Sequence, residues 1–190
     1  MDDYENEADK LLDKGAEAYR NGDYEVAQEY YEQAASLGGD QAACNLGYIY
    51  AFGRTGKRDD EKAFYYFSSA ALDGNPNGMY KVGDAYYYGD FVKKNLEIAF
   101  KCYRNAEFAL GENDDDLRAD VYYRLARSFY YGEGVESDLM LALSYINTAN
   151  TFSYYDLMNH KFGWEALAEK IDHLREEIVS KFQPTILGKE

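Results

Sequence analysis

An alanine recurs at nearly constant intervals along this chain, and each occurrence is followed by the same pattern. Ala27, Ala63, Ala99 and Ala142 are separated by 36, 36 and 43 residues. Four residues after each of them stands a bulky apolar side chain, and seven residues after stands a second alanine. These spacings place the three side chains on one face of an α-helix. A motif that returns at such a period is typical of proteins built from repeated supersecondary units.

A second series of small residues precedes the first. Gly15 stands 12 residues before its alanine, whereas Gly47, Gly83 and Ala126 each stand 16 residues before theirs. Glycine inside a helix costs about 1 kcal/mol relative to alanine, so its presence calls for a packing reason. A small residue lets a neighbouring helix approach closely. Each copy is therefore predicted to be an antiparallel pair, with helix A carrying the small residue and helix B the alanine.

The ends of three A helices are also predicted. Gly53, Gly89 and Gly132 each stand six residues after the small residue of their copy. Glycine adopts the left-handed conformation that commonly ends a helix. After the fourth copy, residues 165–182 have the pattern of an amphipathic helix, with Leu167, Ile171, Leu174 and Ile178 on one face. We interpret this segment as a C-terminal cap.

One helix pair buries only part of its apolar surface, and stacking the next pair covers the rest. The predicted fold class is therefore all-α, an α-solenoid of about four antiparallel helix pairs plus a C-terminal capping helix. We expect one domain over 1–190, with repeats at 8–38, 40–74, 76–110 and 119–150. The cap is placed at 151–182 and a tail outside the fold at 183–190.

The copies resemble two related families of helical repeat. The first copy looks like a tetratricopeptide repeat, on the evidence of Gly15, Tyr19, Gly22, Tyr24, Ala27, Tyr31 and Ala34. Copies two to four are similar to Sel-one-like repeats, whose turn between helices A and B is longer. The resemblance implies a right-handed superhelix whose concave face is lined by the A helices. It also implies a protein-binding role, as an adaptor, scaffold or specific inhibitor.

Charge narrows the range of partners. The chain has 35 acidic and 20 basic side chains, a formal net charge of −15. Such a field repels nucleic acid and anionic membrane surfaces and attracts basic proteins. We therefore expect a protein partner with a basic segment, no nucleic acid and no membrane. The first residues lack the basic and apolar regions of a secretory signal, and two cysteines are too few for a disulfide framework. These features favour a cytoplasmic protein.

The sequence offers little for catalysis, so we predict no enzyme, no cofactor and no metal site. His160 and His173 lie outside the repeats, and Cys44 and Cys102 lie in helical stretches, where free cysteine commonly packs as a small hydrophobe. An alternative comes from secreted Sel-one-like relatives that have been proposed to bind or hydrolyse β-lactams. Those relatives carry two cysteines within each repeat, and no repeat does so here. A self-assembling structural element is a further alternative, although we expect a monomer.

Tyrosine is the residue type that best suits a binding surface. The chain contains 21 tyrosines, and tyrosine offers broad apolar contact together with a hydroxyl group. Those at the Tyr50 and Tyr86 positions are expected to pack in the core. The acidic loop at 111–118 is a possible second site. The predicted partner-binding residues share a place on the A helices and are Tyr48, Asp84, Tyr87, Tyr123, Tyr130 and Tyr131.

Overall fold

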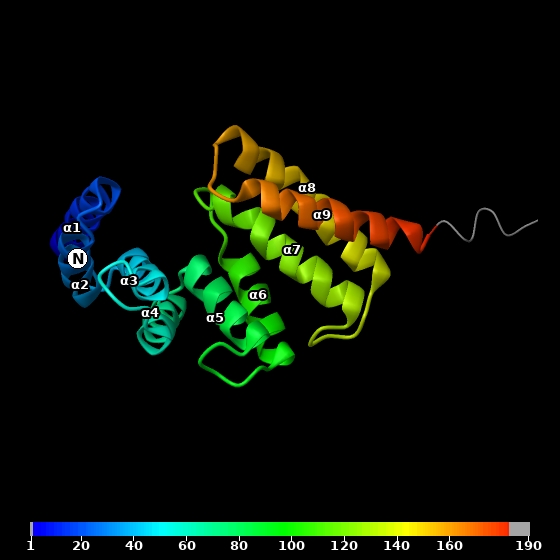
Figure 1. Ribbon diagram of the computed structural model, residues 1–190, viewed down its shortest axis with the longest axis horizontal. Helices are drawn as coiled ribbons and strands as arrows, with labels where there is room; N and C mark the ends of the chain where they lie inside the picture. The colour runs from blue at the N-terminus through cyan, green and yellow to red at the C-terminus, as the bar shows by residue number, and fades with distance from the viewer. Residues whose placement is uncertain (1, 183–190) are drawn as a thin grey trace, which may run out of the picture. The chain divides into compact units, whose positions relative to one another are not determined.

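The computed structural model describes residues 2–182, and every regular element within them is an α-helix (Figure 1). The predicted tail at 183–190 lies outside the described residues. The helices follow one another along the chain as α1 (Asp2–Asn21), α2 (Tyr24–Ser36), α3 (Asp40–Phe52), α4 (Asp60–Leu72), α5 (Pro76–Tyr88), α6 (Leu96–Ala109), α7 (Asp115–Tyr131), α8 (Leu139–Met158) and α9 (Trp164–Ser180). The all-α class is confirmed.

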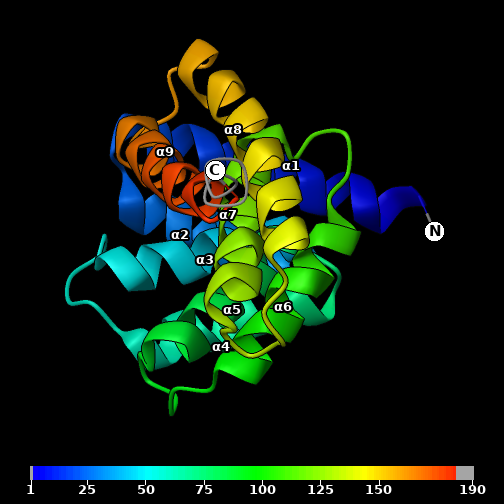
Figure 2. The same ribbon diagram turned by 90° about the vertical axis from the view of Figure 1, so that its right-hand side faces the viewer.

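Contacts along the chain divide it into two compact units, Met1–Lys94 and Asn95–Glu190. In the first unit α1 packs on α2, α3 on α4, and α4 on α5. In the second unit α7, α8 and α9 lie side by side, and α6 packs on α7 (Figures 1 and 2). Each unit is described by itself below.

In the first unit the small residues of the A helices serve the packing role predicted for them. A Cβ added at Gly15 would lie 2.5 Å from Cε1 of Tyr31, and one added at Gly47 would lie 2.5 Å from a ring carbon of Phe67. Both distances are far shorter than a carbon–carbon contact, so only glycine admits the ring. Ala27 and Ala34 on α2 are fully buried beside Tyr31.

The turns also agree with the sequence pattern. Gly53, Gly89 and Gly132 are the C-caps of α3, α5 and α7, with φ angles of 60°, 81° and 71°. Polar side chains cap the following helices. Asp59 accepts a hydrogen bond from the amide of Lys62, and Asp138 accepts two, from the amides of Met140 and Leu141. These bonds satisfy amides that would otherwise have no partner in the first turn.

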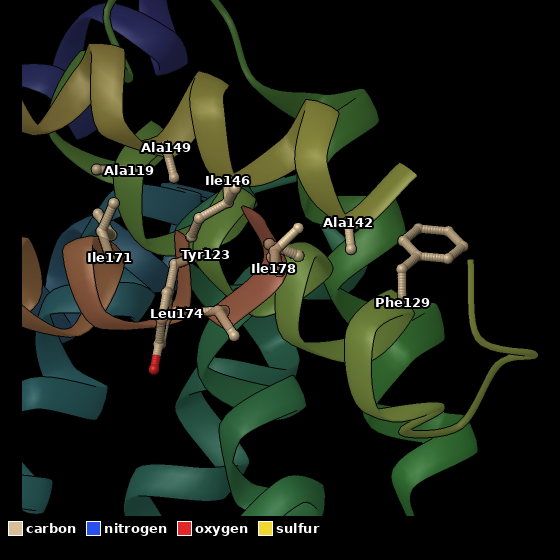
Figure 3. Close-up of a cluster of buried hydrophobic side chains, with 10 residues drawn as sticks. Ala119, Tyr123, Phe129, Ala142, Ile146, Ala149, Ile171, Leu174 and Ile178 are labelled. Carbon is tan, nitrogen blue, oxygen red and sulfur yellow. The ribbon is translucent and has the colours of Figure 1, made fainter. Parts of the chain in front are cut away.

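The core of the second unit lies where α9 covers α7 and α8. Ile171, Leu174 and Ile178 of α9 point toward Ile146 and Ala149 of α8 (Figure 3). All five side chains are nearly or completely buried. The predicted C-terminal helix is thus confirmed, with Leu167 packed at the edge of the same cluster.

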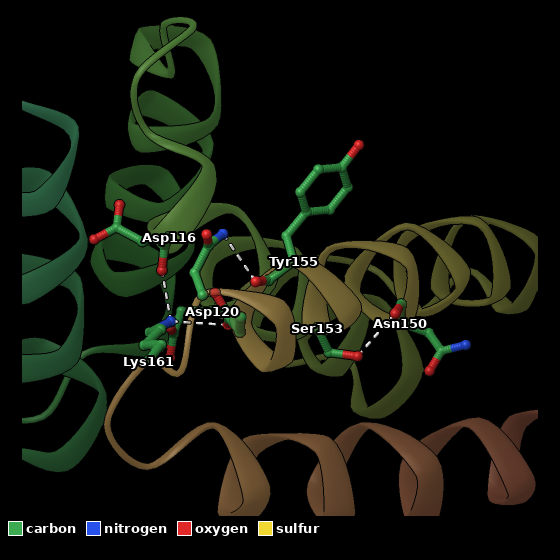
Figure 4. Close-up of polar contacts among 8 residues, drawn as sticks. Asp116, Asp120, Asn150, Ser153, Tyr155 and Lys161 are labelled. Atoms are coloured by element: carbon green, nitrogen blue, oxygen red, sulfur yellow. Dashed lines mark hydrogen bonds and ion pairs between the residues drawn. The ribbon is translucent and has the colours of Figure 1, made fainter.

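Helix α8 continues to Met158, eight residues beyond the predicted end of the fourth repeat. Its inner face carries polar residues there, since Ser153 and Asp156 are both buried. Lys161 forms an ion pair with the buried Asp156 carboxylate, and Figure 4 shows Lys161 beside Asp116 and Asp120. Its Nζ donates to Asp156 Oδ2 at 3.0 Å, to Asp120 Oδ2 at 2.7 Å and to the carbonyl of Asp116 at 2.5 Å. Burial raises the pKa of the Asp156 carboxyl, and Lys161 opposes that shift.

Candidate functional site

The six predicted partner-binding residues are divided between the two units. Tyr48 lies on α3, and Asp84 and Tyr87 lie on α5, all in the first unit. The other three, Tyr123, Tyr130 and Tyr131, lie on α7 in the second unit. Each group is therefore a candidate surface of its own unit.

Tyr48 is partly buried and links α3 to α4 and α5. Its ring stacks on Phe52 at 5.8 Å between centroids and meets the edge of Phe67 at 5.2 Å. Its hydroxyl donates to Asn77 Oδ1 at 2.8 Å, and Lys81 Nζ lies 5.1 Å from the ring centroid. This side chain contributes to helix packing as well as to the surface.

Tyr87 forms an aromatic pair at the end of α5. Its ring centroid lies 4.9 Å from that of Tyr88, in an edge-to-face arrangement. Lys94 Nζ lies 5.4 Å from the Tyr87 ring centroid. Tyr88 is exposed, so this end of α5 presents an aromatic surface to solvent.

Asp84 lies at the wall of a cavity of about 210 Å³ formed by α3, α4 and α5. Small and aromatic side chains line part of it, and charged side chains line the rest. The full lining consists of Ala51, Arg58, Asp60, Ala63, Phe64, Phe67, Lys81, Asp84, Ala85, Tyr88 and Asp90. We call it the α3–α5 cavity.

In the second unit the three tyrosines have different environments. Tyr123 is only 9% exposed and belongs to the core cluster. Tyr130 is partly buried against that cluster, and its ring meets Tyr131 edge-on at 4.7 Å. Tyr131 is 49% exposed, and its hydroxyl donates to Glu177 Oε2 at 2.8 Å. Partial burial and the Glu177 carboxylate raise the pKa of Tyr131 to about 12, so its hydroxyl stays protonated at neutral pH.

Basic side chains of the chain itself lie over several of these rings. Besides Lys81 over Tyr48 and Lys94 over Tyr87, the guanidinium carbon of Arg127 lies 5.0 Å from the Tyr131 ring centroid. All three distances are within the range of a cation–π interaction. Sequence reasoning expected a partner with a basic segment at these tyrosines, and it did not foresee the internal cations.

The cavity was also missed, although the sequence contains a signal for it. Ala51 stands four residues after Gly47, the position that holds Tyr87 and Tyr130 in the next two copies. A small residue replaces a large one at this position. A comparison of the copies at each position would have pointed to an opening there.

The acidic loop at 111–118 is largely satisfied by its own contacts. Asp114 Oδ2 accepts from the amide of Gly111 at 2.7 Å. Arg118 donates to Asp115 Oδ1 at 2.9 Å and to the carbonyl of Gly111 at 2.6 Å. Among residues 2–182, no group of three or more His, Cys, Asp or Glu side chains is arranged to hold a metal ion.

The four candidate nucleophiles and bases are the two cysteines and the two histidines. Burial raises the pKa of the Cys44 thiol to about 12, and burial also raises that of Cys102. His173 is exposed on α9, with Nε2 3.1 Å from Glu177 Oε1. His160 follows the end of α8.

Within the described part of the chain, no helix combines the length and the apolar character needed to cross a membrane.

Comparison with known proteins identifies the repeats. A family model described as Sel1 repeat matches residues 10–39, 40–75, 76–107 and 119–149. The chain belongs to the Sel1 repeat family. Its α-solenoid class follows from that membership and from the helical architecture. The Sel1 model also matches the first copy, in which tetratricopeptide-like features were noted.

Curated relatives include other Sel1 proteins. The chain is 31% identical to "Protein sel-1 homolog 2" of Mus musculus over 129 residues, which is 66% of this chain and 18% of that protein. It is 35% identical to "ERAD-associated E3 ubiquitin-protein ligase component HRD3B" of Arabidopsis thaliana over 146 residues, which is 70% of this chain and 23% of that protein. The Sel1 chain thus spans about a fifth of the length of these relatives.

Solved structures share the fold. A Sel1 repeat protein from Oxalobacter formigenes matches with a TM-score of 0.67 and 19% identity, covering 93% of this chain and 74% of that one. The protective antigen c5321 of uropathogenic Escherichia coli, which has the same repeat fold, matches with a TM-score of 0.55 and 26% identity. That match covers 85% of this chain and 34% of the antigen. Membership of this family supports a role in protein interaction.

Proposed function

We propose that this Sel1 repeat protein is a non-catalytic adaptor or holder that binds a basic, extended segment of another protein on its A helices. A relative whose name describes it as a component of a ubiquitin ligase supports a role within assemblies. The observation that carries the proposal is the surface of α5, where the Tyr87–Tyr88 pair lies beside carboxylates. Asp84 and Asp90 line the same cavity as Tyr88.

The charge of the whole chain supports a basic partner. A net charge of −15 raises the local concentration of cationic segments and accelerates their association. The internal cations over Tyr48, Tyr87 and Tyr131 do not remove this preference, because the chain as a whole has 35 acidic side chains against 20 basic ones. The proposal includes a monomer that acts in the cytoplasm, where free Cys44 and Cys102 would stay reduced.

The test uses three fluorescent twelve-residue peptides of equal length, one rich in Lys and Arg, one rich in Glu and one neutral. Fluorescence anisotropy should show binding of the basic peptide alone, weakening as salt is raised, since exposed charges are screened over about 10 Å at 0.1 M. Tyr87→Ala and the pair Tyr130→Ala with Tyr131→Ala should each be compared with the unsubstituted protein.

The comparison of variants locates the site. Weaker binding by the Tyr87 variant would support the α5 surface, and weaker binding by the Tyr130–Tyr131 variant would support the α7 surface. Circular dichroism must first show that each variant is folded. Equal binding of the acidic and basic peptides, or binding of neither, would overturn the proposal.

A further inference from the structure

Helix α8 differs from the rest of the chain in having almost no charge. Charged residues make up 29% of the sequence, yet Asp156 is the single charged residue among the 20 of α8. The Asp156 side chain is buried and bonded to Lys161. Every exposed residue of α8 is therefore uncharged.

The other copies show that the outer face of helix B ordinarily carries charge. Two residues before the helix B alanine stand Glu25, Glu61 and Glu97 in the first three copies, all of them exposed. Met140 takes this position in the fourth copy, and it is 66% exposed. A large apolar side chain thus replaces a surface carboxylate. Depletion of charged residues and enrichment in methionine and aromatic residues are typical of the centre of a protein interface.

The uncharged residues form a regular stripe along α8. Its members follow one another at steps of four, three, four, three and four residues and are Met140, Ser144, Asn147, Thr151, Tyr154 and Met158. These steps are those of the seam at which two helices of a coiled coil meet. The stripe faces away from the core, because Ala142, Ile146 and Ala149 point inward from the opposite side of the helix (Figure 3). We call this stripe the α8 seam.

The order of side chains along the α8 seam matches a second copy of the same helix that runs antiparallel. In a two-fold pair centred near Ala149, Met140 faces Met158 and Ser144 faces Tyr154. A small side chain opposite a large one lets two helices interdigitate. Parallel copies would instead place each Tyr154 against the same tyrosine and each Ser144 against the same serine, which leaves space between the serines.

The middle of the seam has hydrogen-bonding groups that match across the axis. Asn147 faces Thr151 of the second copy, twice by symmetry. The side-chain oxygen of Asn147 accepts from Arg175 of α9 at 2.9 Å, and the Thr151 hydroxyl donates to the backbone carbonyl of Asn147 at 3.0 Å. The side-chain amide of Asn147 can then donate to the Thr151 hydroxyl oxygen of the other copy. A polar pair in such a seam fixes register and weakens the pairing.

We propose that the α8 seam is a weak self-association face, at which two copies of this chain pair antiparallel about a two-fold axis. The inference goes beyond the proposed function, because the seam lies on a B helix and no A helix takes part. A helix of 20 residues is about 30 Å long and about 10 Å wide, so the seam covers on the order of 300–500 Å² per copy. Stable interfaces bury about 800 Å² per partner. The chain is therefore a monomer when dilute and pairs as its concentration rises.

Charge favours a second copy over the other occupants. A basic segment would find no carboxylate in the seam, and the net charge of −15 repels an anionic membrane surface. Two copies also repel each other at long range, but no charged side chain belongs to the seam. Raising the salt concentration screens this repulsion. Pairing should therefore strengthen with salt, whereas binding of a basic peptide should weaken.

Sedimentation equilibrium from micromolar to near-millimolar protein measures the pairing. We expect the average mass to rise from that of the monomer toward twice that value, and to rise further at high salt than at low salt. Nuclear magnetic resonance should show concentration-dependent shifts at the amides of Ser144, Asn147 and Thr151. A mass that stays at the monomer value over the whole range, or amide shifts confined to other helices, would overturn the proposal.

Met140→Glu and Gln33→Glu form a matched pair of variants. Met140→Glu restores the residue of the other three copies, so the fold should tolerate it, and Gln33→Glu adds the same charge to an exposed position of α2. A charge desolvated in the seam should weaken association about tenfold. Gln33→Glu should leave it unchanged within about twofold. Equal effects of the two variants, each shown by circular dichroism to be helical, would reject the seam.

Cysteine variants test the orientation of the pair. Met140→Cys and Met158→Cys proteins should form a mixed disulfide under mild oxidation faster than either forms a disulfide with its own kind. Mass spectrometry of tryptic peptides identifies the linked positions. Preferential pairing of like variants would overturn the antiparallel arrangement. Because the seam and the A helices carry different residues, failure of these tests would leave the proposed function standing.

Discussion

The ring of Phe67 on α4 lies directly against the backbone of Gly47 on α3, with no room for a methyl group between them. Replacing Gly47 by alanine should force this ring to move. Overpacking costs about 1–3 kcal/mol, and the better helix propensity of alanine returns about 1 kcal/mol. We expect a net loss in the free energy of unfolding of about 1 kcal/mol, measured by urea denaturation.

Double substitution provides the control for Gly47. When Phe67→Leu is added to Gly47→Ala, the smaller leucine side chain should relieve the overlap. The double variant should therefore lose less free energy of unfolding than the sum of the losses of the two single variants. Strict additivity would show that the alanine is accommodated without contact with the Phe67 ring.

The N-caps give a second prediction. Asp138 accepts hydrogen bonds from two amides of the first turn of α8, each at 2.9 Å. Asp138→Ala should lower the free energy of unfolding by about 1 kcal/mol. Asp23 occupies the same position before α2 but makes no side-chain capping bond. Thermal unfolding of Asp23→Ala should therefore show a smaller loss, and equal losses would contradict the structure.

Lys161 gives a third prediction. Its ammonium group bonds two carboxylates and a carbonyl, and the Asp156 side chain is only 2% exposed. Lys161→Met would leave the Asp156 charge buried without its partner, at an expected cost of about 2–3 kcal/mol. The control is Lys170→Met, which changes an exposed lysine on α9 and should alter stability by about 0.5 kcal/mol at most. Equal effects would contradict the network.

The cost of Lys161→Met should depend on pH. Burial raises the pKa of Asp156 in the folded protein, and loss of Lys161 should raise it further. An acid with a raised folded-state pKa binds protons more tightly when folded, so stability rises as pH falls through that pKa. The loss in the free energy of unfolding caused by Lys161→Met should be largest at pH 7. It should shrink toward pH 4, near the pKa of about 3.9 that an aspartate has in the unfolded chain. A deficit that is constant over this range would contradict the assignment to Asp156.

Thiol reactivity gives a fifth prediction. Because the pKa of Cys44 is raised to about 12, its reactive thiolate form is scarce at neutral pH. Iodoacetamide should label the folded protein slowly, with Cys102 reacting before Cys44, since Cys44 is the more buried of the two. Mass spectrometry of tryptic peptides would measure this, and the protein in urea provides the fully labelled control. Rapid labelling of Cys44 would point to an activated thiol.

The sequence was most informative where contacts are repeated. The close approach of the neighbouring helix at Gly15 and Gly47 could be predicted, because a small residue recurs in helix A of every copy, although the rings that fill the space, Tyr31 and Phe67, were not named. Asp59, Asn95 and Asp138 each stand four residues before a helix B alanine. That regularity would have predicted their capping bonds, although we did not use it.

Other features depend on packing that has no simple period. The extension of α8 was hidden because its inner face there carries Ser153 and Asp156, which look like surface residues until Lys161 is placed beside them. The cations over the tyrosine rings depend on side-chain conformations. The six candidate binding residues therefore remain predictions, and Tyr123 has the least surface to offer a partner.

The lysines and the arginine over Tyr48, Tyr87 and Tyr131 bear on how selectively these rings could bind a partner. An aromatic surface left uncovered would adhere weakly to many apolar molecules. Here an incoming group must displace an internal cation or approach from another side, and only a partner with compensating contacts gains by doing so. Under the proposed function, a surface rich in tyrosine can therefore still be selective, because the chain's own cations compete with a partner for the faces of the rings.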